Sequence, residues 1–140
     1  MDDELQIYRV IDANLNRLRE GLRVCEEYFR FVKNEKNEAK KLKELRHKCK
    51  NLQDCFDEKL LFSARNSIDD PFSSGFEALE SERKTTEDLL KANIKRCQEA
   101  SRVLEEFAKL CENTAASKIA KDIRFELYTS EKEIYSGKHI

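Results

Sequence analysis

The sequence predicts an all-α protein: a bundle of four long helices, built from two repeated helical hairpins that a long central linker joins. Three observations lead to this prediction. Gly and Pro, which interrupt helices, number only three and one among 140 residues. Apolar residues recur at the helical period in four long stretches, and one of those stretches is written twice. A chain of this length forms one domain with a modest core, so we expect 1–140 to be a single helical domain.

The four expected helices follow one another with recognisable boundaries. In the first helix, Ile11, Leu18 and Cys25 recur on one face, and Asn34 marks the turn that ends it. Thr114 is the expected N-cap of the last helix, because a hydroxyl oxygen at that position accepts a hydrogen bond from a free backbone N–H. The expected spans are about 4–32, 38–62, 85–111 and 115–135.

The segment 63–83 is the one long irregular stretch, and it holds the single Pro. It separates the two repeat halves, which span about 4–62 and 84–136. Loops of this length in a compact domain are often functional, although a plain strap that crosses the bundle explains the length equally well.

Part of the first helix returns 79 positions later, so that 12–32 is similar to 91–111. Eight of the 21 aligned positions are identical, where chance would give roughly one or two. Packing explains shared Leu and Ala but not shared polar residues, so function is sought in the repeat. The second helices match weakly, 43–46 with 121–124, which coincidence also explains. The polar positions kept in both copies are Asn14/Asn93, Arg17/Arg96, Glu20/Glu99, Arg23/Arg102, Glu26/Glu105 and Glu27/Glu106.

On a helical wheel, Asn14 falls inside the apolar face and Arg17 on its flank. A buried amide needs a hydrogen bond and a guanidinium binds phosphate bidentately, so these positions suit a ligand. A buried polar network that fixes helix register is the alternative. Gly21, whose counterpart is Ala100, indicates either close helix packing or room for a ligand, because Gly weakens a helix by about 1 kcal/mol.

The trailing glutamates and the cysteines are expected to have structural roles. Ion pairs such as Arg23–Glu27, four residues apart, are typical of a solvated helix face. Cys25 and Cys97 fall at apolar positions and are expected to be small core side chains. The glutamates expected on the solvated face are Glu26, Glu27, Glu105 and Glu106.

The composition excludes several classes of function. Lys and Arg number 27 against 28 Asp and Glu, which excludes a generally basic nucleic-acid binder. No apolar run reaches membrane-spanning length, and five cysteines with neither a CxxC pair nor a leader peptide predict a cytoplasmic protein. Neither glycine-rich nucleotide loop is present, and no Glu-x-x-His motif supports a di-iron bundle.

The two copies together resemble a known family over nearly the whole chain. The motifs that carry the resemblance are Ile11-Asp12-Ala13-Asn14-Leu15-Asn16-Arg17 with Arg19-Glu20-Gly21-Leu22-Arg23-Val24, and Ala92-Asn93-Ile94-Lys95-Arg96 with Gln98-Glu99-Ala100 and Arg102-Val103-Leu104-Glu105-Glu106. They look like those of the hydroxymethylpyrimidine-phosphate kinases, small all-α domains found alone or fused to the N-terminus of thiamin-phosphate synthase. The resemblance implies ATP-dependent phosphorylation of hydroxymethylpyrimidine phosphate to its diphosphate in thiamin biosynthesis. It also implies ATP and Mg²⁺ as cofactors and a functional link to thiamin-phosphate synthase.

Taken with the repeat, the resemblance assigns roles to individual residues. Arg17 and Arg96 are the expected catalytic residues, which bind the reacting phosphates. The linker keeps the family's Arg65 and Asp70 but has Asn66 in place of an Asp and Phe72 in place of a Gly, which questions its metal or phosphate role. The expected phosphate- and substrate-binding residues are Asn14, Asn93, Arg23, Arg102, Arg65 and Arg83, and the expected metal-side carboxylates are Glu20, Glu99 and Asp70.

Two other functions stay open at the level of sequence. An all-α Mg-dependent nucleotide pyrophosphohydrolase would cluster acidic residues three or four apart, whereas here Glu alternates with Arg, which favours anion binding. A non-enzymatic helical interaction module would instead expose the repeated residues as ion pairs. The expected partners of a kinase are ATP and a small-molecule substrate, not nucleic acid or a membrane, and a homodimer stays open.

Overall fold

Helices make up the fold in the computed structural model, which describes residues 3–66, 68–70 and 82–137. No strand occurs within those ranges, so the all-α class is confirmed. Residues 71–81 of the linker, with Phe72 among them, lie outside the described residues. The elements are α1 (Asp3–Glu27), the π-helical turn η1 (Tyr28–Val32), α2 (Lys36–Gln53), α3 (Glu58–Ala64), α5 (Thr86–Leu110) and α6 (Thr114–Tyr135).

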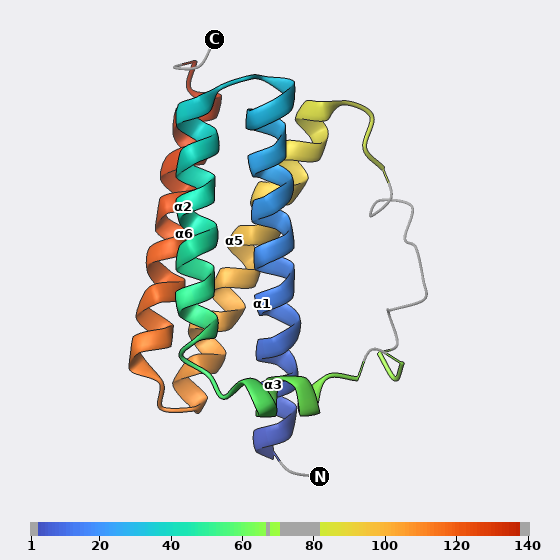
Figure 1. The fold of residues 1–140 in the computed structure, drawn as a ribbon, viewed down its shortest axis with the longest axis vertical. Coiled ribbons are helices and arrows are strands. Elements are labelled where there is room, and N and C mark those ends of the chain that lie inside the picture. Colours follow the sequence, from blue (N-terminus) through green and yellow to red (C-terminus); the bar gives the residue numbers. More distant parts are fainter. Residues whose placement is uncertain (1–2, 67, 71–81, 138–140) are drawn as a thin grey trace.

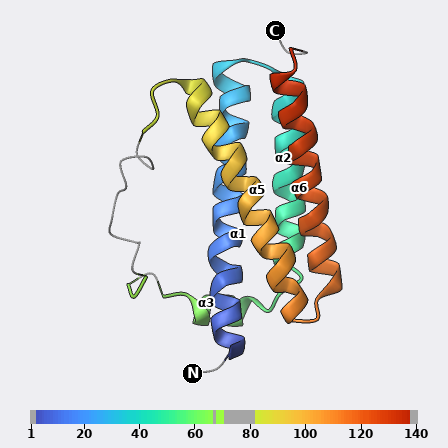
Figure 2. The same cartoon turned by 180° about the vertical axis from the view of Figure 1, so that it is seen from behind.

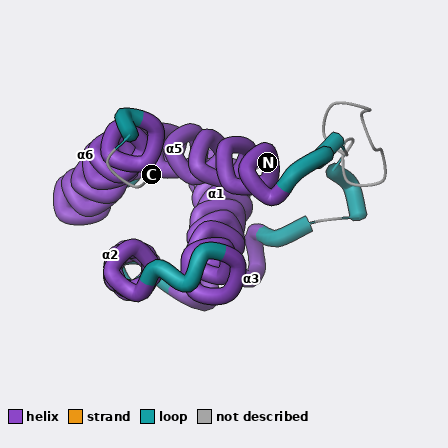
Figure 3. The backbone as a smooth tube through the Cα atoms, turned by 90° about the horizontal axis from the view of Figure 1, so that it is seen from above, coloured by secondary structure: helices purple, strands orange, loops and turns teal. Residues whose placement is uncertain are grey.

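The four long helices lie side by side as two antiparallel pairs. α2 returns alongside α1, and α6 returns alongside α5, with the described C-terminal end near the turn between α1 and α2 (Figure 1). Seen from behind, α5 crosses α1 at a clear angle (Figure 2). Viewed along the helices, the order round an arc is α6, α5, α1 and α2 (Figure 3). Contacts between α2 and α6 close the arc into a bundle.

The most extensive helix contact joins α1 to α5, the two helices that carry the repeat. Leu18 and Leu22 of α1, Leu104 of α5 and Ile123 of α6 are fully buried in one core. Complete burial of a Leu or Ile side chain stabilises a fold by about 1.5–3 kcal/mol. Burial of these side chains in a shared core therefore holds α1 and α5 in a fixed position relative to each other.

The expected helix 38–62 is wrong in one respect, because the chain breaks it after Gln53. A new helix, α3, begins where the Asp57 carboxylate accepts a hydrogen bond from the backbone N–H of Lys59 at 2.9 Å. In the connection, the buried Phe56 packs edge-to-face on Tyr8 with ring centroids 6.0 Å apart. The break therefore places the Phe56 ring against the N-terminal part of α1, and α3 packs on the same helix.

The expected cap of the last helix is wrong by one residue. Asn113, not Thr114, is the N-cap, since its Oδ1 accepts the backbone N–H of Ala116 at 3.1 Å. Its Nδ2 donates to the Cys55 carbonyl at 2.9 Å, so an amide caps the helix and ties it to the end of α2 in a way no hydroxyl could.

The expectation that Glu26 and Glu105 lie on a solvated face is also wrong. They are only 3% and 7% exposed, and each accepts from an arginine of the second helix in its own hairpin. Glu26 pairs with Arg46 at 2.5 Å, and Glu105 pairs with Arg124 at 2.9 Å. The four residues occupy equivalent positions in the two halves, so both hairpins carry the same buried ion pair. The weak match between 43–46 and 121–124 coincides with this shared contact.

The buried cysteines are core side chains, as expected. Cys25, Cys49 and Cys97 are buried free thiols. Burial raises the pKa of the Cys49 thiol to about 11, and a hydrogen bond with Cys25 together with burial raises the pKa of Cys97. The Cys49 and Cys97 thiols therefore stay protonated at neutral pH. Separately, none of the helices in the described ranges has the length and apolar character needed to cross a membrane.

Candidate active site

The two repeat copies meet at equivalent positions. The Cys97 thiol donates to the Leu18 carbonyl at 3.8 Å, and these residues are 79 positions apart, which is the offset of the repeat. On the other side of the core, Lys48 and Glu126, 78 positions apart, form an ion pair between α2 and α6. Contacts between equivalent positions arise where a twofold axis passes, so α1 and α5 are related by a local pseudo-twofold axis near Leu18 and Cys97.

Gly21 lets the two helices approach closely at this crossing. A Cβ at position 21 would lie 2.5 Å from the Cys97 Sγ and 3.6 Å from the Asn93 carbonyl oxygen. The first of these distances is far below van der Waals contact. The sequence left close packing and a ligand as two explanations of Gly21, and close packing is the one seen, although Gly21 also borders the cavity described next.

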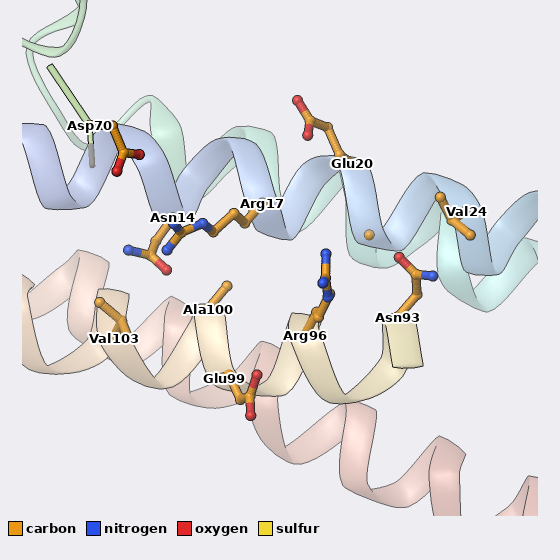
Figure 4. Close-up of a pocket in the computed structure, with 11 residues that line it drawn as sticks. Asn14, Arg17, Glu20, Val24, Asp70, Asn93, Arg96, Glu99, Ala100 and Val103 are labelled. Carbon is orange, nitrogen blue, oxygen red and sulfur yellow. The ribbon is translucent and has the colours of Figure 1, made fainter. Parts of the chain in front are cut away.

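A cavity of about 600 Å³ opens between α1 and α5 on the face with the repeated polar residues (Figure 4). Among the described residues, each copy contributes the same five positions to it, and the linker adds one residue, Asp70. This volume is within the range of small-molecule sites, about 300–1,000 Å³. The lining residues are Asn14, Arg17, Glu20, Gly21 and Val24, their equivalents Asn93, Arg96, Glu99, Ala100 and Val103, and Asp70.

The two asparagines are held alike. Asn14 Nδ2 donates to the Val10 carbonyl at 2.9 Å, and Asn93 Nδ2 donates to the Leu89 carbonyl at 2.8 Å. Each bond runs to the residue four positions earlier in the same helix. It fixes the side-chain amide and leaves its oxygen, which takes no hydrogen bond from the described residues, on the cavity side. Two preset acceptor oxygens suit a ligand that carries N–H or O–H donors.

Arg17 and Arg96 differ from the remaining arginines of the described ranges. Every other one makes a hydrogen bond, an ion pair or a ring contact with the described chain. These two are exposed, make none of these contacts within the described residues, and line the cavity. Neither guanidinium is therefore held by an ion pair within the described residues, and a guanidinium binds phosphate oxygens in pairs.

The carboxylates of the cavity lie apart from one another. Glu20 and Glu99 point to opposite sides in Figure 4, and the Glu20 carboxylate is 3.8 Å from Arg19. Among the described residues, no group of three or more metal-ligating side chains comes together. Mg²⁺ is commonly held by one or two carboxylates plus substrate phosphates. One or two of Glu20, Glu99 and Asp70 therefore fit a metal that arrives with a polyphosphate, though not an all-protein metal site.

The four arginines that were expected to bind phosphate besides Arg17 and Arg96 do not line the cavity; they are Arg23, Arg65, Arg83 and Arg102. Arg23 pairs with Glu27 at 2.8 Å, and Arg102 pairs with Glu106 at 3.1 Å, as solvated ion pairs within their own helices. Arg83 donates to the neighbouring Glu82 carbonyl at 2.8 Å. Nothing in these placements supports direct contact with a ligand in the cavity.

Arg65 instead anchors the linker, with a partner that the sequence did not indicate. Its Nε and Nη2 donate to the two oxygens of Asp12 at 2.8 and 2.7 Å, and its guanidinium lies 4.8 Å from the Phe62 ring centre. Asp12 is 6% exposed, and its side-chain hydrogen bonds raise the pKa of Arg65. A pairing pattern in a helix could not have revealed this contact, because it depends on the path of the linker.

Asn66, where the family resemblance leads one to expect Asp, closes the turn that follows. Its Nδ2 donates to the Asp69 carboxylate at 2.8 Å, and its Oδ1 accepts the Asp69 backbone N–H at 3.1 Å. The Asn66 carbonyl accepts from Arg9 of α1 at 2.8 Å. An ionised Asp cannot donate, so the departure at position 66 favours this turn, which leads directly to Asp70.

Comparison with known proteins places the chain in a family. The model of the ThiD2 family matches residues 9–133. The chain belongs to the ThiD2 family. It is 40% identical over 135 residues to a thiamine-phosphate synthase of Prochlorococcus marinus (strain AS9601), an alignment that covers 96% of this chain and 37% of that protein. It is 38% identical over 128 residues to the thiamine-phosphate synthase of Nostoc punctiforme, with 91% and 35% covered.

This ThiD2-family chain thus spans a little over a third of the length of these relatives, whose names belong to thiamin biosynthesis. No solved structure matches it. The matched range includes every residue that lines the cavity, so the site belongs to the domain that the family shares.

Proposed function

We propose that this protein transfers the γ-phosphoryl group of ATP to hydroxymethylpyrimidine phosphate and so forms the diphosphate used in thiamin biosynthesis. One observation supports the proposal above the rest: the cavity between α1 and α5 presents, from equivalent positions, two guanidinium groups that form no ion pair within the described residues. Such a pair suits a reaction between two phosphate-bearing substrates, because each guanidinium can neutralise charge on one of them. Membership of the ThiD2 family and the thiamine-phosphate synthase relatives agree with the pathway.

The proposed chemistry needs little from the protein besides positioning and charge. The nucleophile is an oxygen of the acceptor phosphate, which is already ionised at neutral pH, so no general base is required. A bond forms between this oxygen and the γ-phosphorus, while the bond from the γ-phosphorus to the bridging oxygen breaks and its electron pair leaves with ADP. Arg17 and Arg96 offset the repulsion between the two anions, and Asn14 and Asn93 orient the bound groups.

Mg²⁺ bound with the nucleotide would supply further neutralisation of phosphate charge. Asp70, with Glu20 or Glu99, would hold it on the cavity side. In the same proposal the protein is cytoplasmic and its product supplies thiamin-phosphate synthase. The ADP released and the diphosphate formed account for every phosphoryl group.

The two alternatives fit the cavity less well. A Mg-dependent pyrophosphohydrolase relies on clustered carboxylates, and the described residues bring no such cluster together. An interaction module would pair its repeated charges on the surface, as Arg23 and Arg102 do, yet Arg17 and Arg96 are unpaired within the described chain beside a cavity.

The test is a ³¹P NMR assay of the purified protein with MgATP and hydroxymethylpyrimidine phosphate. We expect ADP and the pyrimidine diphosphate to appear in equal amounts. The free hydroxymethylpyrimidine alcohol is the control and should give no product, because it lacks the phosphate that the second arginine binds. A folded protein that yields no ADP, or that yields ADP and inorganic phosphate without the acceptor, would contradict the proposal.

A further inference from the structure

Among the described residues that line it, the cavity is symmetric except at one position. Every lining residue of α1 has an equivalent in α5, whereas Asp70 comes from the linker, which is not repeated. Figure 4 looks along the pseudo-twofold axis: Asn14 and Val103 lie at one end of the cavity, Asn93 and Val24 at the other, and Asp70 lies at the Asn14 end. Glu20 and Glu99 are equivalents of each other, so they do not distinguish the two ends.

Asp70 is held at this end by contacts with the first half of α1. Arg65 is bound by Asp12, two residues before Asn14, and the Asn66 carbonyl is bound by Arg9. The turn closed by Asn66 and Asp69 then leads straight to position 70. Arg65 and Asn66, which both contact α1, therefore fix the start of the linker near the Asn14 end.

A fixed carboxylate distinguishes two kinds of phosphate ligand. It repels a bare phosphate, because like charges at close range are unfavourable. It attracts a phosphate group that arrives as a complex with Mg²⁺, since the carboxylate can become one of the metal's oxygen ligands. Of the two substrates of the proposed reaction, ATP is the one that carries a polyphosphate able to chelate Mg²⁺.

We propose that the Asn14 end, with Arg17 and Asp70, binds the triphosphate of MgATP, and that the Asn93 end, with Arg96, binds the phosphate of the acceptor. This assignment rests on the proposed function. The γ-phosphoryl group then moves across the pseudo-twofold axis, from the Arg17 side to the Arg96 side. The acceptor oxygen gains the bond to phosphorus, and ADP stays at the Asp70 end with the electron pair of the broken bond.

The repeat supplies a matched pair of variants to test this: Arg17→Gln and Arg96→Gln. Both side chains are exposed and make no hydrogen bond, ion pair or ring contact within the described residues, so both variants should fold like the parent, which circular dichroism checks. Calorimetric titration measures the affinity for a non-hydrolysable ATP analogue with Mg²⁺ and, separately, for hydroxymethylpyrimidine phosphate. A lost charge-assisted hydrogen bond weakens binding about ten- to a hundredfold. Arg17→Gln should cause this loss for the nucleotide alone, and Arg96→Gln for the acceptor alone.

Asp70→Asn gives a signature that a general loss of structure would not. It should weaken binding of the Mg–nucleotide complex and leave the acceptor unaffected, while the same nucleotide in EDTA should bind equally or more tightly. Three results would overturn the assignment of the two ends but not the proposed function. The two arginine variants could show the reversed pattern, they could lose affinity equally for both ligands, or Asp70→Asn could lose affinity for the acceptor. A parent protein that binds neither ligand would overturn the proposed function with it.

Discussion

Substitution of Gly21 by Ala tests how closely α1 and α5 must approach to form the cavity. A Cβ at position 21 would lie 2.5 Å from the Cys97 Sγ, whereas favourable contacts begin near 3.5 Å. Cys97 is fully buried, so the helices must move apart by up to about 1 Å. Overpacking of this kind costs about 1–3 kcal/mol, and the better helix propensity of Ala returns about 1 kcal/mol. We expect Gly21→Ala to lower the free energy of unfolding by about 1 kcal/mol.

The assay is a double-mutant cycle in which urea unfolding is followed by far-UV circular dichroism. Cys97→Ala removes the sulfur that the new methyl group meets, so Gly21→Ala made in that background should be neutral or stabilising. The coupling energy between the two substitutions should therefore be about 1–3 kcal/mol and favourable. Ala100→Gly, at the equivalent position of α5, is the matched control and should show no such rescue by Cys97→Ala.

A different result would refute the packing argument. If Gly21→Ala stabilises the parent protein by about 1 kcal/mol, then helix propensity alone describes this position and the contact with Cys97 is unimportant. Because Gly21 borders the cavity, the same variant should also bind ligands more weakly than the Gly21→Ala/Cys97→Ala double variant does.

Three further outcomes are expected. Arg46→Met should destabilise the fold by about 3 kcal/mol in urea unfolding, because it leaves the buried Glu26 carboxylate unpaired, and the added substitution Glu26→Leu should restore much of the loss. The free energy of unfolding should fall between pH 9 and 11, because the unfolded chain loses the protons of Cys49 and Cys97 above pH 9 while the folded protein keeps them, in the case of Cys49 up to about pH 11. The Cys49 component of this fall should be about 3 kcal/mol, and a Cys49→Ala variant measured across this range should lack it. Asp12→Asn should release Arg65 and raise the KM for MgATP severalfold in steady-state kinetics, with an unchanged KM for the acceptor and a stability change of only about 1 kcal/mol; equal effects on both KM values would argue against a local role for the linker anchor.

The repeat singled out from the sequence the polar residues that line the cavity, because shared polar positions are harder to explain by packing than shared Leu and Ala. Asn14 and Arg17 stood out at the edge of the apolar face, and their equivalents followed by alignment. Both copies then contribute to one cavity, a consequence of the crossing of α1 and α5 near Leu18 and Cys97.

The contacts that the sequence did not reveal all involve a second element. A helical wheel describes one helix in isolation, so it placed Glu26 and Glu105 on the surface, although arginines of the neighbouring helices bury them. Likewise, Arg65 was expected to bind phosphate, whereas in the structure it pairs with Asp12. This pairing depends on the linker passing over α1, which the sequence does not show. The tertiary path of the chain decides such contacts, and periodicity within one helix carries no information on it.

Turnover by variants of the two cavity asparagines tests the central claim most directly, namely that the doubled polar set forms a catalytic site. Asn14→Ala and Asn93→Ala each remove one preset amide oxygen and one hydrogen bond to a helix carbonyl. We expect the fold to survive this small loss, and circular dichroism is the check. In the ³¹P NMR assay, both variants should form the pyrimidine diphosphate at least about tenfold more slowly than the parent. Parent-like rates in both folded variants would contradict the claim that this cavity carries the reaction.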